Sequence, residues 1–189
     1  MLKLLTSVLA AFMLALPASF VQADEYSETI SIFKNAGACG AFFKSAYGYA
    51  VFPMIGKGGF VLGGAYGKGR VYEKGRYVGD TSVIQLSAGW QLGGQAYSQI
   101  IFFENRSAFD EFTSGNFEFS ADASAVAITA GANAMASTAG SSAGASGTSE
   151  HATAAGQYYK GMATFTVAKG GLMYAATLGG QKYSYEPRK

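Results

Sequence analysis

Histidine and cysteine, two side chains that often carry out catalysis, are scarce in this sequence of 189 residues. The chain contains one histidine, His151, and one cysteine, Cys39. A serine or cysteine nucleophile needs a base held beside it, and His151 instead lies just beyond a tract of small residues. Lys57 follows a glycine but lacks the earlier glycine and the following serine or threonine of a phosphate-binding loop. The sequence therefore predicts a protein that is not an enzyme, and neither a cofactor nor a metal site is expected.

Four carboxylates lie near one another in the sequence: Asp110, Glu111, Glu118 and Asp122. Two carboxylates held close together can serve as a general acid and a general base. Three of these four are expected on the surface of a helix or a strand, where most charged side chains lie. We therefore assign them no catalytic role.

Basic side chains beside glycine-rich segments are the strongest candidates for a binding surface. Seven of them fall in or next to such segments and a predicted hairpin: Lys57, Lys68, Arg70, Lys74, Arg76, Lys169 and Lys182. If they gather at one end of a sheet, they would meet the anionic head groups of a membrane, while tyrosine and phenylalanine rings reach the interface. The alternative is a set of edge charges that keep strands soluble. The formal net charge of +2 is too small for the strong positive field that nucleic acid binding requires.

The first 23 residues have the layout of an export signal. Lys3 precedes an apolar run over residues 4–16, and Ala23 precedes the acidic Asp24. This order predicts a secretory signal peptide over residues 1–23. A membrane anchor that stays in place is the alternative, but the run is shorter than the roughly 20 residues that a spanning helix needs. Residues 24–189 are then expected to form a single exported domain, periplasmic or secreted.

The remaining sequence changes from a helical pattern to a strand pattern. Apolar residues at helical spacing predict an amphipathic helix over 26–37. From Tyr47 onward, aromatic and β-branched residues alternate with glycine pairs, and residues 74–75 form the expected tight turn of a hairpin. Ser107 begins a Ser-x-x-acid pattern that predicts a short helix near 107–114. The fold class is therefore α+β and rich in β-structure.

A repeated phrase bears on the shape of the sheet. LGGQAYS occupies residues 92–98, and LGGQKYS occupies 178–184. Glycine weakens a strand unless the strand bends sharply or another group approaches its backbone. We therefore expect a strongly coiled, glycine-rich antiparallel sheet or a small barrel, in which Gln95 and Gln181 bond backbone groups left unpaired by the bends. The candidate structural glycines are Gly58, Gly59, Gly63, Gly64, Gly93, Gly94, Gly179 and Gly180.

Two further features affect the domain but suggest no chemistry. Residues 129–149 consist almost entirely of Ala, Gly, Ser and Thr, which predicts a flexible segment or a weak inserted helix. Cys39 stands between Ala38 and Gly40 and is expected to be a small buried side chain, with a reactive thiol as the alternative. A single cysteine excludes an internal disulfide.

An ordered set of motifs extends over residues 28 to 185. VFP is followed by KGGF, GGAYG, GWQLGGQ and then a phenylalanine pair before the short helix. Together they resemble the SYLF domain family, a lipid-binding module of eukaryotic actin and membrane-trafficking regulators that is widespread in exported bacterial proteins. The resemblance implies a non-enzymatic domain that binds membrane lipid. It also implies phosphoinositide or actin binding in the eukaryotic branch, but actin is not expected as the partner of an exported protein.

The resulting hypothesis is an exported protein that binds membrane phospholipid, most readily anionic phospholipid, and associates peripherally with the membrane. The alternative is a structural envelope protein or an outer-membrane barrel, which glycine-rich, aromatic strands would also suit. A high-salt wash discriminates between them because it releases only a peripheral protein.

The export signal gives a first testable prediction. Because small residues precede the acidic start at Asp24, we expect the mature chain to begin at Asp24. N-terminal sequencing of the exported protein measures this directly. A chain that still begins at Met1 would contradict the prediction.

Overall fold

The helix predicted near the start of the domain is present and begins with a side-chain cap. The computed structural model describes residues 24–56, 64–86, 96–119, 123, 125–128, 157–169, 178 and 180–189. Asp24 accepts a hydrogen bond from the backbone N–H of Tyr26, which fills one of the free donors at the start of helix α1 (Glu25–Asn35). Two short helices follow, α2 (Gly37–Gly40) and α3 (Phe42–Ser45).

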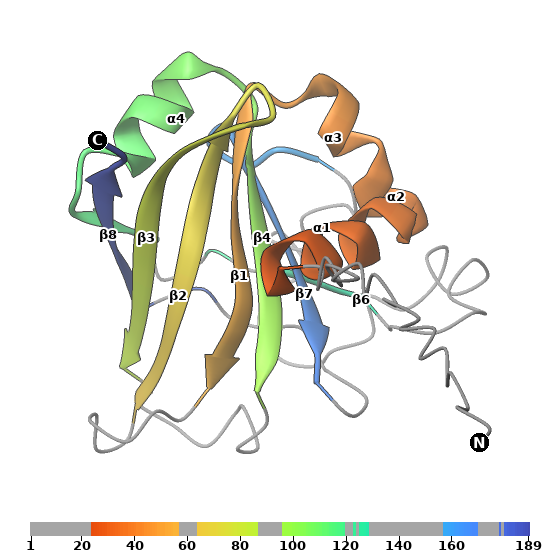
Figure 1. The fold of residues 1–189 in the computed structure, drawn as a ribbon, viewed down its shortest axis with the longest axis horizontal. Coiled ribbons are helices and arrows are strands. Elements are labelled where there is room, and N and C mark those ends of the chain that lie inside the picture. The colour runs from red at the N-terminus through yellow and green to blue at the C-terminus, as the bar shows by residue number, and fades with distance from the viewer. Residues whose placement is uncertain are drawn as a thin grey trace, which may run out of the picture.

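The described strands form one curled, eight-stranded sheet in the order β5-β8-β3-β2-β1-β4-β7-β6 (Figure 1). All neighbouring pairs are antiparallel except β6 and β7, which are parallel. The predicted α+β, β-rich class is therefore confirmed, and the sheet is an open half-barrel. The strands are β1 (Gly48–Gly56), β2 (Gly64–Glu73), β3 (Arg76–Leu86), β4 (Tyr97–Phe103), β5 (Phe117–Glu118), β6 (Val126–Ile128), β7 (Met162–Ala168) and β8 (Gln181–Pro187).

Each face of the sheet packs against a different layer. The outer face meets α1–α3 through a cluster that includes Phe33, Phe42 and Phe102. The inner, concave face meets α4 (Arg106–Phe112), whose Phe109 and Phe112 join the main core. Figure 1 shows α1–α3 on one side of the sheet and α4 at the end where the β2–β3 hairpin turns. Strand β4 is buried along its whole length because both faces are covered.

The hairpin predicted at residues 74–75 is confirmed. Lys74 has φ 49° and Gly75 has φ 80°, so both central residues of the turn are left-handed. Turns of this type match the twist of antiparallel strands. Here the two turn residues alone connect β2 to β3, since Glu73 and Arg76 are already paired.

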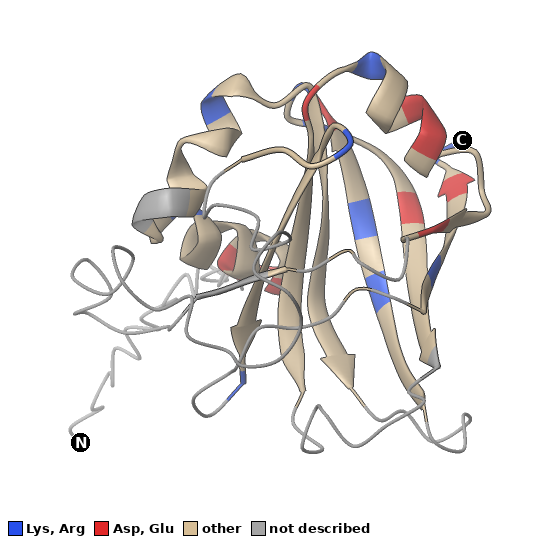
Figure 2. Cartoon of the chain, turned by 180° about the vertical axis from the view of Figure 1, so that it is seen from behind, with Lys and Arg blue, Asp and Glu red and all other residues tan. Residues whose placement is uncertain are grey.

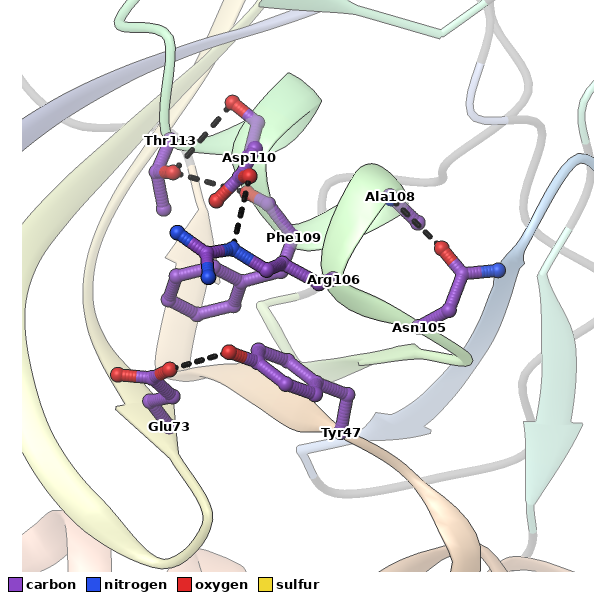
Figure 3. Close-up of polar contacts among 8 residues, drawn as sticks. All are labelled: Tyr47, Glu73, Asn105, Arg106, Ala108, Phe109, Asp110 and Thr113. Carbon is purple, nitrogen blue, oxygen red and sulfur yellow. Dashed lines mark hydrogen bonds and ion pairs between the residues drawn. The ribbon is translucent and has the colours of Figure 1, made fainter.

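The start of α4 corrects the predicted helix cap. Ser107 was expected to begin the helix, but the cap is Asn105, whose side-chain oxygen accepts from the N–H of Ala108 at 3.0 Å (Figure 3). Asparagine caps a helix as well as serine does. The helix therefore starts earlier than predicted, and Ser107 lies in its first turn.

Strand β1 runs through the middle of the sheet although it contains a proline. The register of β1 shifts between Val51 and Met54 against β2, which marks a bulge at Pro53. Ser98 of β4 donates to the carbonyl oxygen of Pro53 at 2.7 Å. The bulge turns Met54 outward, where 57% of its surface is exposed.

The tightest packing between β1 and β2 involves glycines that the repeated phrase did not indicate. A Cβ atom at Gly67 would lie 2.7 Å from the Ile55 side chain, and one at Gly69 would lie 2.6 Å from the ring of Phe52. These two β2 positions therefore make room for the large side chains of β1. Of the predicted glycines, Gly64 begins β2 and Gly180 precedes β8 with φ 81°. The following predicted positions lie outside the described residues: Gly58, Gly59, Gly63, Gly93, Gly94 and Gly179.

This close packing predicts the effect of adding one methyl group. Gly69→Ala should lower the free energy of unfolding by about 1 to 3 kcal/mol, because the new Cβ overlaps the buried ring of Phe52. Urea denaturation of both proteins measures the difference. Lys68→Ala is the matched control, since Lys68 is the exposed neighbour on the same strand. Equal midpoints for Gly69→Ala and the unaltered protein would show that the packing tolerates a side chain there.

Candidate functional site

Part of the outer face lies beyond the helices, toward the end of the sheet opposite the β2–β3 hairpin. Strand pairing places its side chains in two rows across neighbouring strands. One row runs through Gly56, Tyr66, Ile84 and Lys182, and the next runs through Met54, Lys68, Ser82 and Ser184. We call the five large side chains among them the outer patch: Met54, Tyr66, Lys68, Ile84 and Lys182.

The outer patch combines exposed apolar surface with positive charge. Met54, Tyr66 and Ile84 are exposed by 57%, 36% and 40%. Lys68 is exposed and forms no ion pair with another described residue, while Lys182 lies 3.4 Å from a carboxylate oxygen of Glu118. Large apolar side chains grouped beside lysines are typical of a surface that contacts a partner or a membrane interface.

Arg70 has a structural contact network, although the sequence suggested it for the same surface. Its guanidinium forms an ion pair with Asp24 and stacks 4.0 Å from the ring centre of Tyr26. It also lies 5.1 Å from the ring centre of Tyr77 on β3. These contacts hold the start of α1 against the sheet. We therefore assign Arg70 a structural role and leave it out of the outer patch.

Lys74 and Arg76 lie at the other end of the sheet, Lys74 in the hairpin turn and Arg76 at the start of β3. The ammonium of Lys74 stands 5.2 Å from the ring centre of Tyr47. The Tyr47 hydroxyl in turn donates to a carboxylate oxygen of Glu73 (Figure 3), and this hydrogen bond raises the pKa of Tyr47. Lys74 therefore stands over an aromatic ring whose hydroxyl is bonded to Glu73.

The six candidate basic residues that the structure describes therefore do not gather at one end. Figure 2 marks every described Lys and Arg in blue, and these positions are spread over the molecule. Lys169 follows β7, where its backbone N–H donates to the carbonyl of Ala96, and Lys57 lies outside the described residues. Lys68 and Lys182 are the two that share one described surface.

The inner face holds a polar network that sequence reasoning missed. The Tyr97 hydroxyl donates to Gln85 at 2.9 Å, and Gln181 donates to the same hydroxyl at 3.0 Å. Gln99 donates to the hydroxyl of Tyr183 at 2.7 Å and to the side-chain oxygen of Gln181 at 3.2 Å. We call these five residues the inner network, and all of them are buried.

The inner network also corrects the role expected for the glutamine of the repeated phrase. Gln181 was expected to bond backbone groups left unpaired at a bend, but among the described residues its side chain bonds the side chains of Gln85, Tyr97, Gln99 and Tyr183. Its counterpart Gln95 lies outside the described residues. One signal in the sequence could have indicated this network. Each repeated phrase places a glutamine two residues before a tyrosine, and residues two apart in a strand lie on the same face.

Burial changes the acidity of several side chains. Burial raises the pKa of Tyr97 and Tyr183 well above the usual value for a tyrosine, and it raises the pKa of Tyr49 to about 12. Burial also raises the pKa of the Cys39 thiol, which has no exposed surface. The expectation that Cys39 is a small buried side chain is confirmed, and such a thiol does not form the reactive thiolate.

Two observations concern other kinds of site. Among the described residues, no three His, Cys, Asp or Glu side chains stand close enough to hold a metal ion. None of the helices described above has the length and apolar character to span a membrane.

The buried tyrosines predict a loss of stability in alkali. An unfolded tyrosine releases its proton near pH 10, whereas Tyr97 and Tyr183 keep theirs to higher pH in the folded protein. Above about pH 10 the unfolded state therefore binds fewer protons, and the free energy of unfolding falls as the pH rises. Urea midpoints at pH 8 and pH 11 measure this loss.

Tyr183→Phe should be less stable at pH 8, because Gln99 loses a buried partner, and should lose less stability between pH 8 and pH 11. Tyr66→Phe, on the exposed outer patch, is the control and should behave like the unaltered protein. An alkaline loss in Tyr183→Phe as large as in the unaltered protein would contradict the prediction.

Comparison with known proteins places the chain in a family. None of the curated proteins searched matches it. The model of the Ysc84 family, described as Las17-binding protein actin regulator, matches residues 84–186. The matched part is more than half of the chain and includes the whole inner network. The chain therefore belongs to the Ysc84 family of SYLF domains.

Proposed function

We propose that this protein is an exported, non-enzymatic lipid-binding protein that associates peripherally with membranes rich in anionic phospholipid. The family supports a lipid-binding or actin-regulator-like role in general terms. Lipid is the partner that suits an exported chain, and the export signal expected over residues 1–23 supports a location in the periplasm or outside the cell. The surface that we assign to the membrane is the outer patch.

The observation that carries this proposal is the exposure of three apolar side chains beside two lysines. Met54, Tyr66 and Ile84 stand on three neighbouring strands, within two rows of the same face. Apolar side chains and an aromatic ring gain free energy when they leave water for the boundary between head groups and acyl chains. The outer face of the sheet presents them together in neighbouring rows, where one membrane surface can contact all three.

The charges of the outer patch support an anionic surface. Each lysine close to an anionic membrane contributes about 1 kcal/mol, and the contribution falls off within a Debye length. Lys68 and Lys182 flank the apolar side chains on β2 and β8. The nearest acidic residues on β3 and β8, Asp80 and Glu186, lie in the row of Arg70. That row is next to the row of Lys68, on the side nearer the hairpin. Lys57 follows Gly56 directly in the sequence and stays a predicted contributor.

The lysines of the outer patch provide the functional test. The double change Lys68→Gln and Lys182→Gln should weaken binding to phosphatidylglycerol vesicles by about 2 kcal/mol at low salt, which is roughly thirtyfold. Co-sedimentation with vesicles measures it, and phosphatidylcholine vesicles should bind the unaltered protein much less. Raising the salt concentration should reduce the difference between the two lipids.

The control is a second pair of basic residues in the same protein. Lys74→Gln with Arg76→Gln removes the same charge at the opposite end of the sheet and should leave vesicle binding nearly unchanged. Equal losses from both pairs would show that net charge acts without a specific surface. If the unaltered protein sediments with neither lipid, the proposed function is wrong.

A further inference from the structure

Two threonines of β7 lie inside the curl of the sheet, beside the inner network. Phe165 packs with the helices on the outer face, so its neighbours Thr164 and Thr166 point to the inner face. Only 4% of Thr164 and 0% of Thr166 is exposed. Thr166 is the register partner of Gln99, which belongs to the inner network. The two threonines therefore extend the polar part of the interior from β4 to β7.

The hydroxyl groups of Thr164 and Thr166 form no hydrogen bond with any described residue. Thr81 of β3 is also buried, but its hydroxyl donates to the carbonyl oxygen of Ser184 at 2.6 Å. A buried hydroxyl without a partner destabilises a fold, and the large majority of such groups in proteins bond another group or an ordered water. Two unbonded hydroxyls on one strand therefore point to a bound molecule that supplies the partner.

The spacing of the two hydroxyls prevents them from bonding each other. Residues two apart in a strand are about 6.6 Å apart, whereas a hydrogen bond between two oxygen atoms spans about 2.8 Å. A partner for both must therefore lie between them, on the inner side of β7.

The side of β7 next to β6 presents a small residue. The two strands are parallel, with Val126 opposite Phe165. Continuing this register by one residue brings Ala125, which is buried, beside Thr164. The methyl group of an alanine neither donates nor accepts a hydrogen bond. A small molecule meets less bulk there than on the β4 side, where Ile101 is the partner of Thr164.

Gln99 adds further hydrogen-bonding capacity next to Thr166. Its amide nitrogen donates to Gln181 and to Tyr183, which uses both of its protons. Its side-chain oxygen accepts from Gln181 at 3.4 Å, and an amide oxygen can accept a second bond. A buried water typically makes about three hydrogen bonds. Two hydroxyls and one amide oxygen supply that number.

The interior favours an uncharged molecule over an ion. No Asp, Glu, Lys or Arg is found among the buried residues that the structure describes. Burial raises the pKa of Tyr97 and Tyr183 well above the usual value for a tyrosine, so both stay neutral near pH 7. An ion would lose its hydration there without gaining an opposite charge. The hydroxyl and amide groups present both donate and accept, which matches a hydroxyl group.

From these contacts we propose that the inner side of β7 is a binding site for a small uncharged molecule that carries a hydroxyl group. The molecule accepts a hydrogen bond from one threonine, Thr164 or Thr166, and donates its own proton to the other threonine or to Gln99. Water is the smallest molecule of this class, and a short diol presents the same group twice. The site lies on the opposite face from the outer patch and does not rest on the proposed function.

Nuclear Overhauser contacts between water and the folded protein test the site directly. The methyl protons of Thr164 and Thr166 should show cross peaks at the water frequency in the unaltered protein. Thr81 is the matched control, because its buried hydroxyl already bonds a carbonyl, and its methyl group should show a much weaker cross peak. This control also accounts for cross peaks that arise when a threonine hydroxyl proton exchanges with the solvent.

Ethylene glycol distinguishes water from a larger molecule of the same class. If a diol replaces the water, titration with ethylene glycol should shift the backbone amides of residues 99, 164 and 166 and weaken the water cross peaks. If these signals stay unchanged while the cross peaks are present, the bound molecule is water. Absence of both the cross peaks and the shifts would overturn the proposal. Equal shifts with sodium acetate would contradict the uncharged class.

Two variants provide an independent test with a defined sign. Thr164→Val and Thr166→Val replace the hydroxyl with a methyl group. If each hydroxyl bonds a molecule in the interior, each change should lower the urea midpoint, as Thr81→Val should at a bonded hydroxyl. Removing a buried hydroxyl that has no partner would instead stabilise the fold. A higher midpoint in either variant would overturn the proposal.

Vesicle binding separates this site from the proposed function. Thr166→Val changes only the inner face and should sediment with phosphatidylglycerol vesicles as the unaltered protein does. The cross peaks and the urea midpoints are measured without lipid, so they stand even if the unaltered protein binds no vesicle. The two proposals therefore fail separately.

Discussion

The inner network is the interaction on which the curled shape of the sheet depends. Strands β4 and β8 are separated in the sheet by three other strands, yet Gln99 reaches Gln181 and Tyr183 directly across the concave face. Such contacts exist only when the sheet is strongly curled. Each of these buried polar groups would cost about 1 to 3 kcal/mol if it lost its partner. A flatter sheet would break several of these bonds at once, so the network holds the curvature within narrow limits.

The same curvature determines which surfaces remain available for binding. The space inside the curl is filled by large side chains such as Phe52, which requires the bare backbone of Gly69 on the neighbouring strand. The helices α1–α3 cover only the part of the outer face near β1, β4 and β7. The outer patch on β1, β2, β3 and β8 is therefore open because the helical layer ends, and Arg70 marks that border through its contacts with α1.

Local features of the fold could be predicted from the sequence, and long-range ones could not. The helix after Asp24 and the turn at Lys74 and Gly75 depend on residues adjacent in the chain, so periodicity and turn chemistry indicate them. The inner network and the ion pair of Arg70 with Asp24 join residues far apart in sequence. Strand order decides those contacts, and one sequence does not reveal strand order. For the same reason the basic residues could be named in advance, but their distribution between the two ends of the sheet could not.

The stacking around Tyr77 has a consequence for engineering the domain. Arg70 pairs with Asp24 and lies 5.1 Å from the ring centre of Tyr77. Arg188 lies 4.9 Å from the centre of the same ring. The first and last described segments of the domain therefore come together at a single side chain of β3. Domains whose ends meet in space tolerate circular permutation and insertion into host proteins. A short linker between these ends, with new termini opened at the β2–β3 turn, would give a permuted chain with the same sheet order.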